Sequence, residues 1–198
     1  MRPRCVILAG PNGAGKSTHA RQIVQQLHGI ERFINPDTIA SGLAGFSRAS
    51  ADRDAGRIAL NAITDAITNR IDFAFETTLA GRRWPRLLDR LDRAGFEVLL
   101  HYLWMPRADL CVERVRTRVS MGGHDVPEVD VRRRYVSSLQ NLMDIFMLRD
   151  TAWHVLDASV AGQLAPIATG GAGRPLNVIE PQLWHQLVPR TGSRERRS

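Results

Sequence analysis

Residues 10–18 read GPNGAGKST and directly follow the apolar run CVILA. A short, continuous apolar run that ends at a glycine turn is typical of a strand buried on both faces of a parallel sheet. After the turn, apolar residues recur with helical spacing over residues 16–27. The stretch therefore predicts a strand, a glycine-rich loop and a helix in that order, which is how an α/β fold begins.

The loop has the spacing G-x-x-x-x-G-K-S, in which backbone N–H groups surround phosphate oxygens and the serine ligates magnesium. Lys16 is the one lysine of the chain, although Lys and Arg together number 27. A compact ammonium group can reach the β- and γ-phosphate oxygens, whereas a wide guanidinium would collide with the surrounding backbone. We interpret the loop as a binding site for ATP and Mg²⁺. Its residues are Gly10, Pro11, Asn12, Gly13, Ala14, Gly15, Lys16, Ser17 and Thr18.

The rest of the chain alternates between short apolar runs and helical patterns, which favours a parallel sheet with helices on both faces. We predict an α/β, three-layer P-loop NTPase (kinase-like) fold with a mainly parallel central sheet of about five strands and a helical lid. Residues 1–190 are expected to form a single domain, with the lid at about 119–131 and a disordered tail at 191–198. The segment ATGGAGRP reads as a turn-rich connector before an edge strand and a short helix. Further strands are expected at 33–34, 73–75, 97–104 and 153–156, and helices at 51–70, 84–94, 108–119 and 127–148.

Asp37 follows the second predicted strand in the sequence Asn35-Pro36-Asp37. Pro36 keeps Asn35 extended, so Asp37 is expected at the carboxyl edge of the sheet, beside the phosphate loop. A carboxylate there can accept a proton from a substrate hydroxyl, or hold magnesium together with Ser17. The structural alternative is that Asp37 only caps the helix that starts at Thr38.

Glu76-Thr77-Thr78 ends the third predicted strand at the same edge. These side chains could bind hydroxyl groups of an acceptor or orient the metal. An ordinary turn with a helix cap is the alternative. We take Glu76 and Thr78 as candidate substrate-binding residues.

Residues 112–135 contain two arginine-rich helical patterns joined by Gly122-Gly123. Arg114 and Arg118 share one helical face, and His124 follows the glycine pair as a candidate substrate contact. Such a hairpin could close over a transferring phosphoryl group, where guanidinium charge stabilises the transition state. A solvated arginine-rich hairpin is the alternative. The candidate catalytic arginines beyond the glycines are Arg132, Arg133 and Arg134, among which the sequence does not choose.

The net charge of +7 admits nucleic acid or a phosphorylated small molecule as a partner. Arginines and aspartates alternate at helical spacing over residues 82–93, which predicts a solvated helix face with ion pairs along it. The apolar runs are too short to span a bilayer, and two widely spaced cysteines indicate a reducing compartment. We expect a cytoplasmic protein with no membrane partner.

Taken together, the segments AGPNGAGKST, INPD, FAFETTLAG, YLWMP and GGHDVPEVDVRRRYVSSLQNL resemble the zeta toxin family, in this order and over about residues 4–160. The resemblance implies a P-loop kinase-like sandwich that uses ATP and Mg²⁺. Zeta toxins phosphorylate the 3′-hydroxyl of UDP-N-acetylglucosamine and are held inactive by an antitoxin protein.

Residue by residue, the resemblance implies ATP and magnesium binding by Lys16 and Ser17, and Asp37 as the catalytic base. Glu76 and Thr78 match a Glu-x-Thr motif that would contact the acceptor.

The first lid arginine would be Arg118, and the second would be one of the triplet Arg132–Arg134, with Arg133 and Arg134 as our candidates. Asp157-Ala158-Ser159 is similar to an Asp-Asn-Ser motif of short relatives, from which Ala158 departs.

The sequence therefore predicts an ATP-dependent kinase acting on a small-molecule hydroxyl, with UDP-N-acetylglucosamine as one acceptor and an antitoxin as one partner. Two alternatives remain open at this point. One is a regulatory P-loop ATPase without a metabolite acceptor, for which ATP turnover would not respond to added acceptors. The other is a nucleic-acid-binding or nucleic-acid-kinase module, for which binding would depend steeply on salt.

Overall fold

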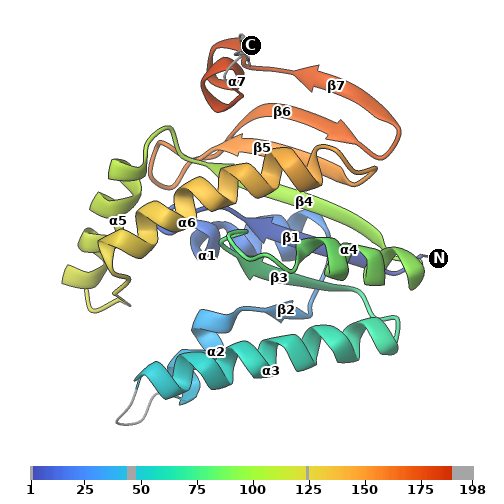
Figure 1. Cartoon of the computed structure of the whole chain (residues 1–198), viewed down its shortest axis with the longest axis horizontal. Helices are drawn as coiled ribbons and strands as arrows, with labels where there is room; N and C mark the ends of the chain where they lie inside the picture. Colours follow the sequence, from blue (N-terminus) through green and yellow to red (C-terminus); the bar gives the residue numbers. More distant parts are fainter. Residues whose placement is uncertain (1, 44–47, 124, 189–198) are drawn as a thin grey trace, which may run out of the picture.

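The computed structural model describes residues 2–43, 48–123 and 125–188, and it has three layers: a central sheet with helices on both faces (Figure 1). The strands are β1 (Arg4–Ala9), β2 (Phe33–Ile34), β3 (Phe73–Thr77), β4 (Glu97–Trp104), β5 (Ala152–Asp157), β6 (Ala165–Gly171) and β7 (Arg174–Val178). The helices are α1 (Lys16–Ala20), α2 (Pro36–Leu43), α3 (Arg48–Thr68), α4 (Trp84–Arg93), α5 (Ala108–Ser120), α6 (Glu128–Asn141) and α7 (Pro181–Leu187). The π-helical segments η1 (Arg21–Leu27) and η2 (Leu142–Phe146) continue α1 and α6.

The sheet has seven strands in the order β2-β3-β1-β4-β5-β6-β7. Strands β1 to β5 are parallel, and β6 and β7 add an antiparallel hairpin at one edge. The predicted fold class, with its five mainly parallel strands, is confirmed. Because parallel strands end at the same edge, the segments after β1, β2, β3 and β5 meet there.

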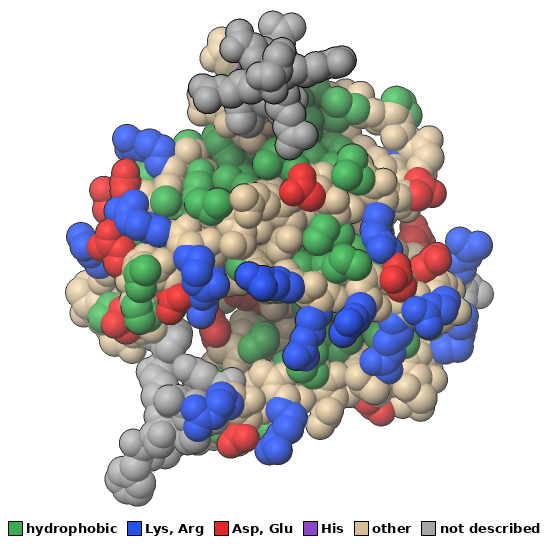
Figure 2. All heavy atoms as spheres, viewed as in Figure 1, with side chains coloured by type: hydrophobic (Ala, Val, Ile, Leu, Met, Phe, Trp, Pro, Cys, Tyr) green, Lys and Arg blue, Asp and Glu red, His purple; other side chains and the backbone are tan. Residues whose placement is uncertain are grey.

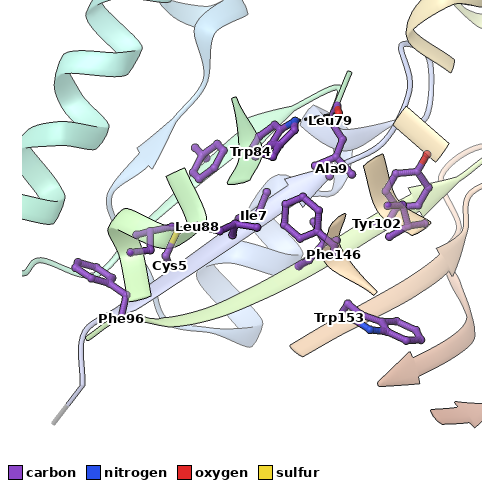
Figure 3. Close-up of a cluster of buried hydrophobic side chains, with 14 of the residues drawn as sticks. Cys5, Ile7, Ala9, Leu79, Trp84, Leu88, Phe96, Tyr102, Phe146 and Trp153 are labelled. Atoms are coloured by element: carbon purple, nitrogen blue, oxygen red, sulfur yellow. Dashed lines mark hydrogen bonds between the residues drawn. The ribbon is translucent and has the colours of Figure 1, made fainter. Parts of the chain in front are cut away.

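Successive side chains of each strand point to opposite faces of the sheet, and a hydrophobic core covers each face. The larger core joins β1, β3, β4 and β5 to α3, α4, η2 and α7. Figure 3 shows side chains of this core from β1, β4, β5, α4 and η2. The second core joins the opposite face to α1, η1 and α5. Burial on both faces explains why the central strands read as continuous apolar runs.

The segment ATGGAGRP was predicted as a connector, and this prediction is wrong. It forms most of the β6–β7 hairpin, with residues 171–173 at the turn. Gly170 lies inside β6. A larger residue does not fit there, because a Cβ atom would lie 2.6 Å from the Trp153 ring. A glycine that permits close packing looks the same in sequence as a glycine that makes a turn. The expected edge strand and short helix are present as β7 and α7.

The ion pairs predicted along residues 82–93 are also not found among the described residues. Asp89 pairs instead with Arg149, beyond η2, at 2.7 Å, and Arg90 donates a hydrogen bond to Thr64 of α3. Figure 2 shows basic side chains in a row over α4. Asp89 and Arg90 thus connect α4 to its neighbours.

Two predicted features fall on residues that the structure does not describe, and a third concerns membrane spans. The predicted disordered tail, residues 191–198, lies outside the described residues, as does His124. Among the helices that the structure describes, none combines the length and apolar character needed to cross a membrane.

On the sheet face that carries η1, one histidine contacts two others. His101 of β4 is 2% exposed, and its Nε2 atom lies 2.8 Å from Nε2 of His28, which follows η1. The ring of His154 on β5 packs edge-on against His101, with 4.9 Å between ring centroids. Burial, with smaller contributions from His154 and His28, lowers the pKa of His101 to about 3. The folded protein therefore keeps His101 neutral.

We predict that acid destabilises the fold through this residue. Unfolded His101 binds a proton below pH ~6.5, whereas folded His101 binds one only near pH 3, so stability present above pH ~6.5 is lost as the pH falls. The loss at pH 5 is about 2 kcal/mol. Urea unfolding at pH 7 and pH 5 measures it, and His101→Gln should reduce the difference by about this amount. An equal difference in both proteins would contradict the assignment.

Candidate active site

A cavity of about 620 Å³ opens at the carboxyl edge of the parallel strands. Its wall combines the phosphate loop, the residues after β2, β3 and β5, and the facing sides of α5 and α6. The residues that line it are Asn12, Gly13, Ala14, Gly15, Lys16, Ser17, Thr18, His19, Asn35, Pro36, Asp37, Glu76, Thr77, Thr78, Arg114, Thr117, Arg118, Met121, Arg134, Ala158, Val160, Ala161 and Gly162. The segments singled out in the sequence therefore meet at one place.

The phosphate loop packs directly on α5. Gly13 has φ of 80°, and a Cβ atom there would lie 2.8 Å from the carbonyl oxygen of Cys111, so this position needs glycine. Arg114 of α5 donates to the carbonyl oxygens of Ala158 at 2.7 Å and Ser159 at 2.6 Å, and at a longer 3.4 Å to that of Gly13. Arg114 thus joins α5 to the loop after β5.

Lys16 begins α1 and is 7% exposed. Its Nζ atom donates to the carbonyl oxygen of Pro11 at 3.0 Å and lies 3.9 Å from Oε1 of Glu76. Burial lowers the pKa of Lys16 from its ordinary value, and the carboxylates of Glu76 and Asp37 act in the opposite direction. The ammonium group is therefore enclosed, and it faces acidic side chains at the cavity.

Glu76 is the buried carboxylate of the site, with 7% exposure near the end of β3. Its Oε2 atom accepts hydrogen bonds from the hydroxyl of Ser17 at 2.8 Å and from the amide of Asn35 at 3.0 Å. The sequence indicated that Asp37 would accompany Ser17, but the structure pairs Ser17 with Glu76. Glu76 thus lies on the phosphate-loop side of the cavity.

Asp37 lies in the first turn of α2, is exposed, and lines the cavity. The backbone N–H groups of Asp37 and Thr38 donate to Oδ1 of Asn35, at 2.8 and 3.3 Å. Asn35, rather than Asp37, is therefore the cap of α2. The carboxylate of Asp37 is not needed to start the helix.

The structure separates the three arginines that the sequence could not order. Arg134 lines the cavity, whereas Arg133 pairs with Asp130 at 2.7 Å on the exposed side of α6. Arg132 pairs with Asp109 and Glu128, each at 2.8 Å. Arg118 of α5 also lines the cavity. The placement of Arg133 does not agree with its prediction as a catalytic residue, because the helix turns it away from the cavity.

Several lining residues were not expected from the sequence. The sequence placed Arg114 on the same helical face as Arg118, but we did not predict it as a site residue. Thr117, Met121 and residues 160–162 carry no motif, and only the fold brings them to the cavity. Thr78 lies at the cavity wall as a candidate acceptor contact.

Comparison with known proteins places this site in a family. Residues 5–140 match the family described as AAA domain. The chain belongs to this AAA domain family. Its phosphate loop, Asp37, Glu76, the three cavity arginines and all of α6 except its last residue fall within the matched residues.

Two relatives extend the comparison of this AAA domain chain. An uncharacterized protein of Haemophilus influenzae is 33% identical over 135 residues, which cover 68% of this chain and 94% of that protein. An adenylate kinase of Rhizobium rhizogenes is 42% identical over 72 residues, which cover 34% of this chain and 33% of that enzyme. The second match thus spans only a third of the enzyme.

Solved structures share the fold at low sequence identity. A chain in the crystal structure of the AvrRxo1-ORF1:-ORF2 complex with ATP superposes with a TM-score of 0.77 at 18% identity, over 97% of this chain and 65% of that chain. A structure of the PezAT chromosomal toxin-antitoxin system of Streptococcus pneumoniae gives 0.64 at 15% identity, over 97% and 81%. The resemblance to zeta toxins is confirmed at the level of the fold. The AAA domain chain is a P-loop kinase-like domain.

Proposed function

We propose that this protein is an ATP-dependent phosphotransferase that phosphorylates a hydroxyl group of a small molecule. One observation carries the proposal. Lys16, Glu76 and Asp37 line the same cavity as Arg118 and Arg134, so a candidate phosphate site, a candidate base and two guanidinium groups share one space.

The phosphate loop is the proposed ATP site. Lys16 would contact the β- and γ-phosphates, and the N-terminus of α1 would contribute its partial positive charge. The neighbouring AvrRxo1-ORF1:-ORF2 structure contains ATP, which supports the choice of nucleotide.

Magnesium is the proposed metal, and the donors present agree with its chemistry. Ser17 and Glu76 offer hard oxygen ligands 2.8 Å apart, with Asp37 on the same cavity wall. Magnesium in kinases is held by one or two protein oxygens together with substrate phosphates, so a site of this size needs no larger cluster. When bound, the metal would neutralise developing charge on the phosphate oxygens. Asn35 would orient Glu76 through its 3.0 Å hydrogen bond.

Asp37 is the proposed general base. Its exposed carboxylate would accept the proton of the acceptor hydroxyl as the acceptor oxygen attacks the γ-phosphorus and the bond to ADP breaks. Thr78, directly after β3, would contact the acceptor. Arg118 and Arg134 would close on the phosphoryl group, with residues 119–131 as the lid of a single domain.

The proposed acceptor is a nucleotide sugar such as UDP-N-acetylglucosamine, and the proposed partner is an antitoxin protein in the cytoplasm. The similarity to zeta toxins supports the acceptor. The AvrRxo1-ORF1:-ORF2 complex and the PezAT toxin-antitoxin system support the partner.

Incubation with γ-labelled ATP, Mg²⁺ and a metabolite extract tests the function, with UDP-N-acetylglucosamine as a defined acceptor. We expect transfer of label to an organic acceptor. Release of labelled phosphate at a rate independent of any acceptor would reject the kinase and favour a regulatory ATPase. Binding to an oligonucleotide that weakens steeply with salt would favour a nucleic-acid module.

Two neighbouring arginines provide a matched comparison. Arg134→Ala should lower the rate of phosphoryl transfer by about 10³-fold or more, because an arginine at the transferring group stabilises charge in the transition state. Arg133→Ala should leave the rate nearly unchanged, because its guanidinium is occupied by Asp130 outside the cavity. Single-turnover kinetics at saturating ATP measures both. Equal effects of the two substitutions would contradict the assignment.

A further inference from the structure

The inner face of α6 carries three polar side chains at consecutive turns. Arg134, Ser138 and Asn141 are spaced i, i+4 and i+7, so they lie along one side of the helix. Arg134 lines the cavity. Ser138 is fully buried, and its hydroxyl hydrogen-bonds that of Tyr102 on β4 at 2.9 Å.

Asn141 reaches the loop between β3 and α4. Its Nδ2 atom donates to the carbonyl oxygens of Leu79 at 2.6 Å and Gly81 at 2.8 Å. These two bonds use both hydrogens of the amide. They connect α6 to the segment that directly follows Thr78.

Leu79 adopts an unusual backbone conformation in this loop. It is fully buried and has φ of 61°, a left-handed conformation that a leucine rarely adopts. Such a residue persists only where its surroundings hold it, and such residues cluster at functional sites. Its N–H group donates to the hydroxyl of Thr77 at 3.0 Å, and its carbonyl oxygen accepts a second bond, at 3.0 Å, from the indole of Trp84.

Trp84 is itself held firmly. Figure 3 shows its indole directed at Leu79, with a dashed line marking the hydrogen bond. The ring stacks on Phe75 with 6.1 Å between centroids and meets Phe146 edge-on at 5.6 Å. Leu79 therefore receives one hydrogen bond from a rigid part of the core and one from α6.

We propose that Asn141 is a positioning residue for the acceptor. By holding Leu79 in its left-handed conformation, it fixes the adjacent Thr78 at the cavity wall. By lying on α6, it also ties that wall to the helix that carries Arg134. The inference rests on the proposed kinase function for its catalytic consequence, but the structural part can be measured without activity.

The chemistry of the contact specifies asparagine. Two carbonyl oxygens need two N–H donors at the end of a short side chain. Asn141→Asp has nearly the same shape but places a carboxylate against both carbonyl oxygens. Asn141→Leu keeps a similar volume and removes the donors. Gln140→Ala, on the exposed side of the same helix, is the matched control.

Amide hydrogen exchange of residues 77–83 in the ligand-free protein is the first measurement. We expect exchange there to rise about tenfold or more in both Asn141 variants and to match the wild type in Gln140→Ala. Trp84→Phe, which keeps an aromatic ring but loses the N–H donor, should also raise it. Unchanged exchange in folded Asn141 variants would overturn the proposal.

Kinetics is the second measurement, with γ-labelled ATP and the acceptor that wild-type protein phosphorylates. We expect kcat/KM for the acceptor to fall about 10- to 100-fold, because small misplacements of positioning groups carry effects of this size. The Kd for ATP should remain unchanged. A parallel loss of ATP affinity and melting temperature would indicate a merely structural role and overturn the proposal. If wild-type protein phosphorylates nothing, the proposed function fails, and hydrogen exchange alone decides whether Asn141 holds the loop.

Discussion

Asp37→Asn is expected to lower the rate of phosphoryl transfer by about 10²- to 10⁴-fold, which is the usual contribution of a general base. Asparagine has nearly the same shape but cannot accept the proton of the acceptor hydroxyl at neutral pH. The fold should not change, because Asn35 rather than Asp37 caps α2. ATP affinity should be nearly unchanged, because Lys16 and the phosphate loop remain intact. Single-turnover transfer and ATP titration measure the two effects.

Asp92→Asn provides a control for Asp37→Asn. It removes the same charge from an exposed position on α4 that does not line the cavity. Its rate should equal that of the wild type. If Asp37→Asn retains full transfer to the acceptor, Asp37 is not the base.

Lys16→Arg is expected to lower kcat by about 10²-fold or more, although it keeps the positive charge, because removing one well-placed donor to a developing oxyanion has effects of this size. The Nζ atom is enclosed between the carbonyl oxygen of Pro11 and Glu76. A planar guanidinium is wider than this space allows. It must therefore either move the phosphate loop or break the hydrogen bond between Glu76 and Ser17. Lys16→Met, which fills a similar volume without charge, should show a comparable loss.

The control is Arg21→Lys, an equally conservative exchange at an exposed position on η1. It should leave both ATP affinity and transfer unchanged. Circular dichroism establishes that each variant is folded. Normal turnover by Lys16→Arg would show that the loop accepts either cation. The argument from the width of the guanidinium group would then be wrong.

The segments of the site could be predicted from sequence because strand ends in a parallel sheet share one edge. Their inner contacts could not. Phe73, Ala74 and Phe75 are all buried, so β3 has no alternation from which to read the direction of Glu76. Its pairing with Ser17 follows from the position of β3 beside β1, which is tertiary information.

The arginine triplet shows the same limit in a helix. Consecutive residues point in three directions, so the phase of α6 decides which one reaches the cavity. That phase is set by Val131 and Ser138, which are fully buried. Their spacing of seven residues places Arg134 beside the buried stripe and Arg133 on the far side. Because Ser138 is polar, the sequence does not indicate that this position is buried, and the phase of α6 could not be predicted.

Asn35 combines two tasks that no other small side chain can perform together. Its oxygen accepts the first N–H groups of α2, and its nitrogen donates to Glu76. Conversion to aspartate would remove the donor and place two carboxylates together, so spontaneous deamidation would damage the site. The usual succinimide route needs the backbone N–H of the following residue, and Pro36 has none. The proline that starts α2 thereby also protects the site from chemical ageing.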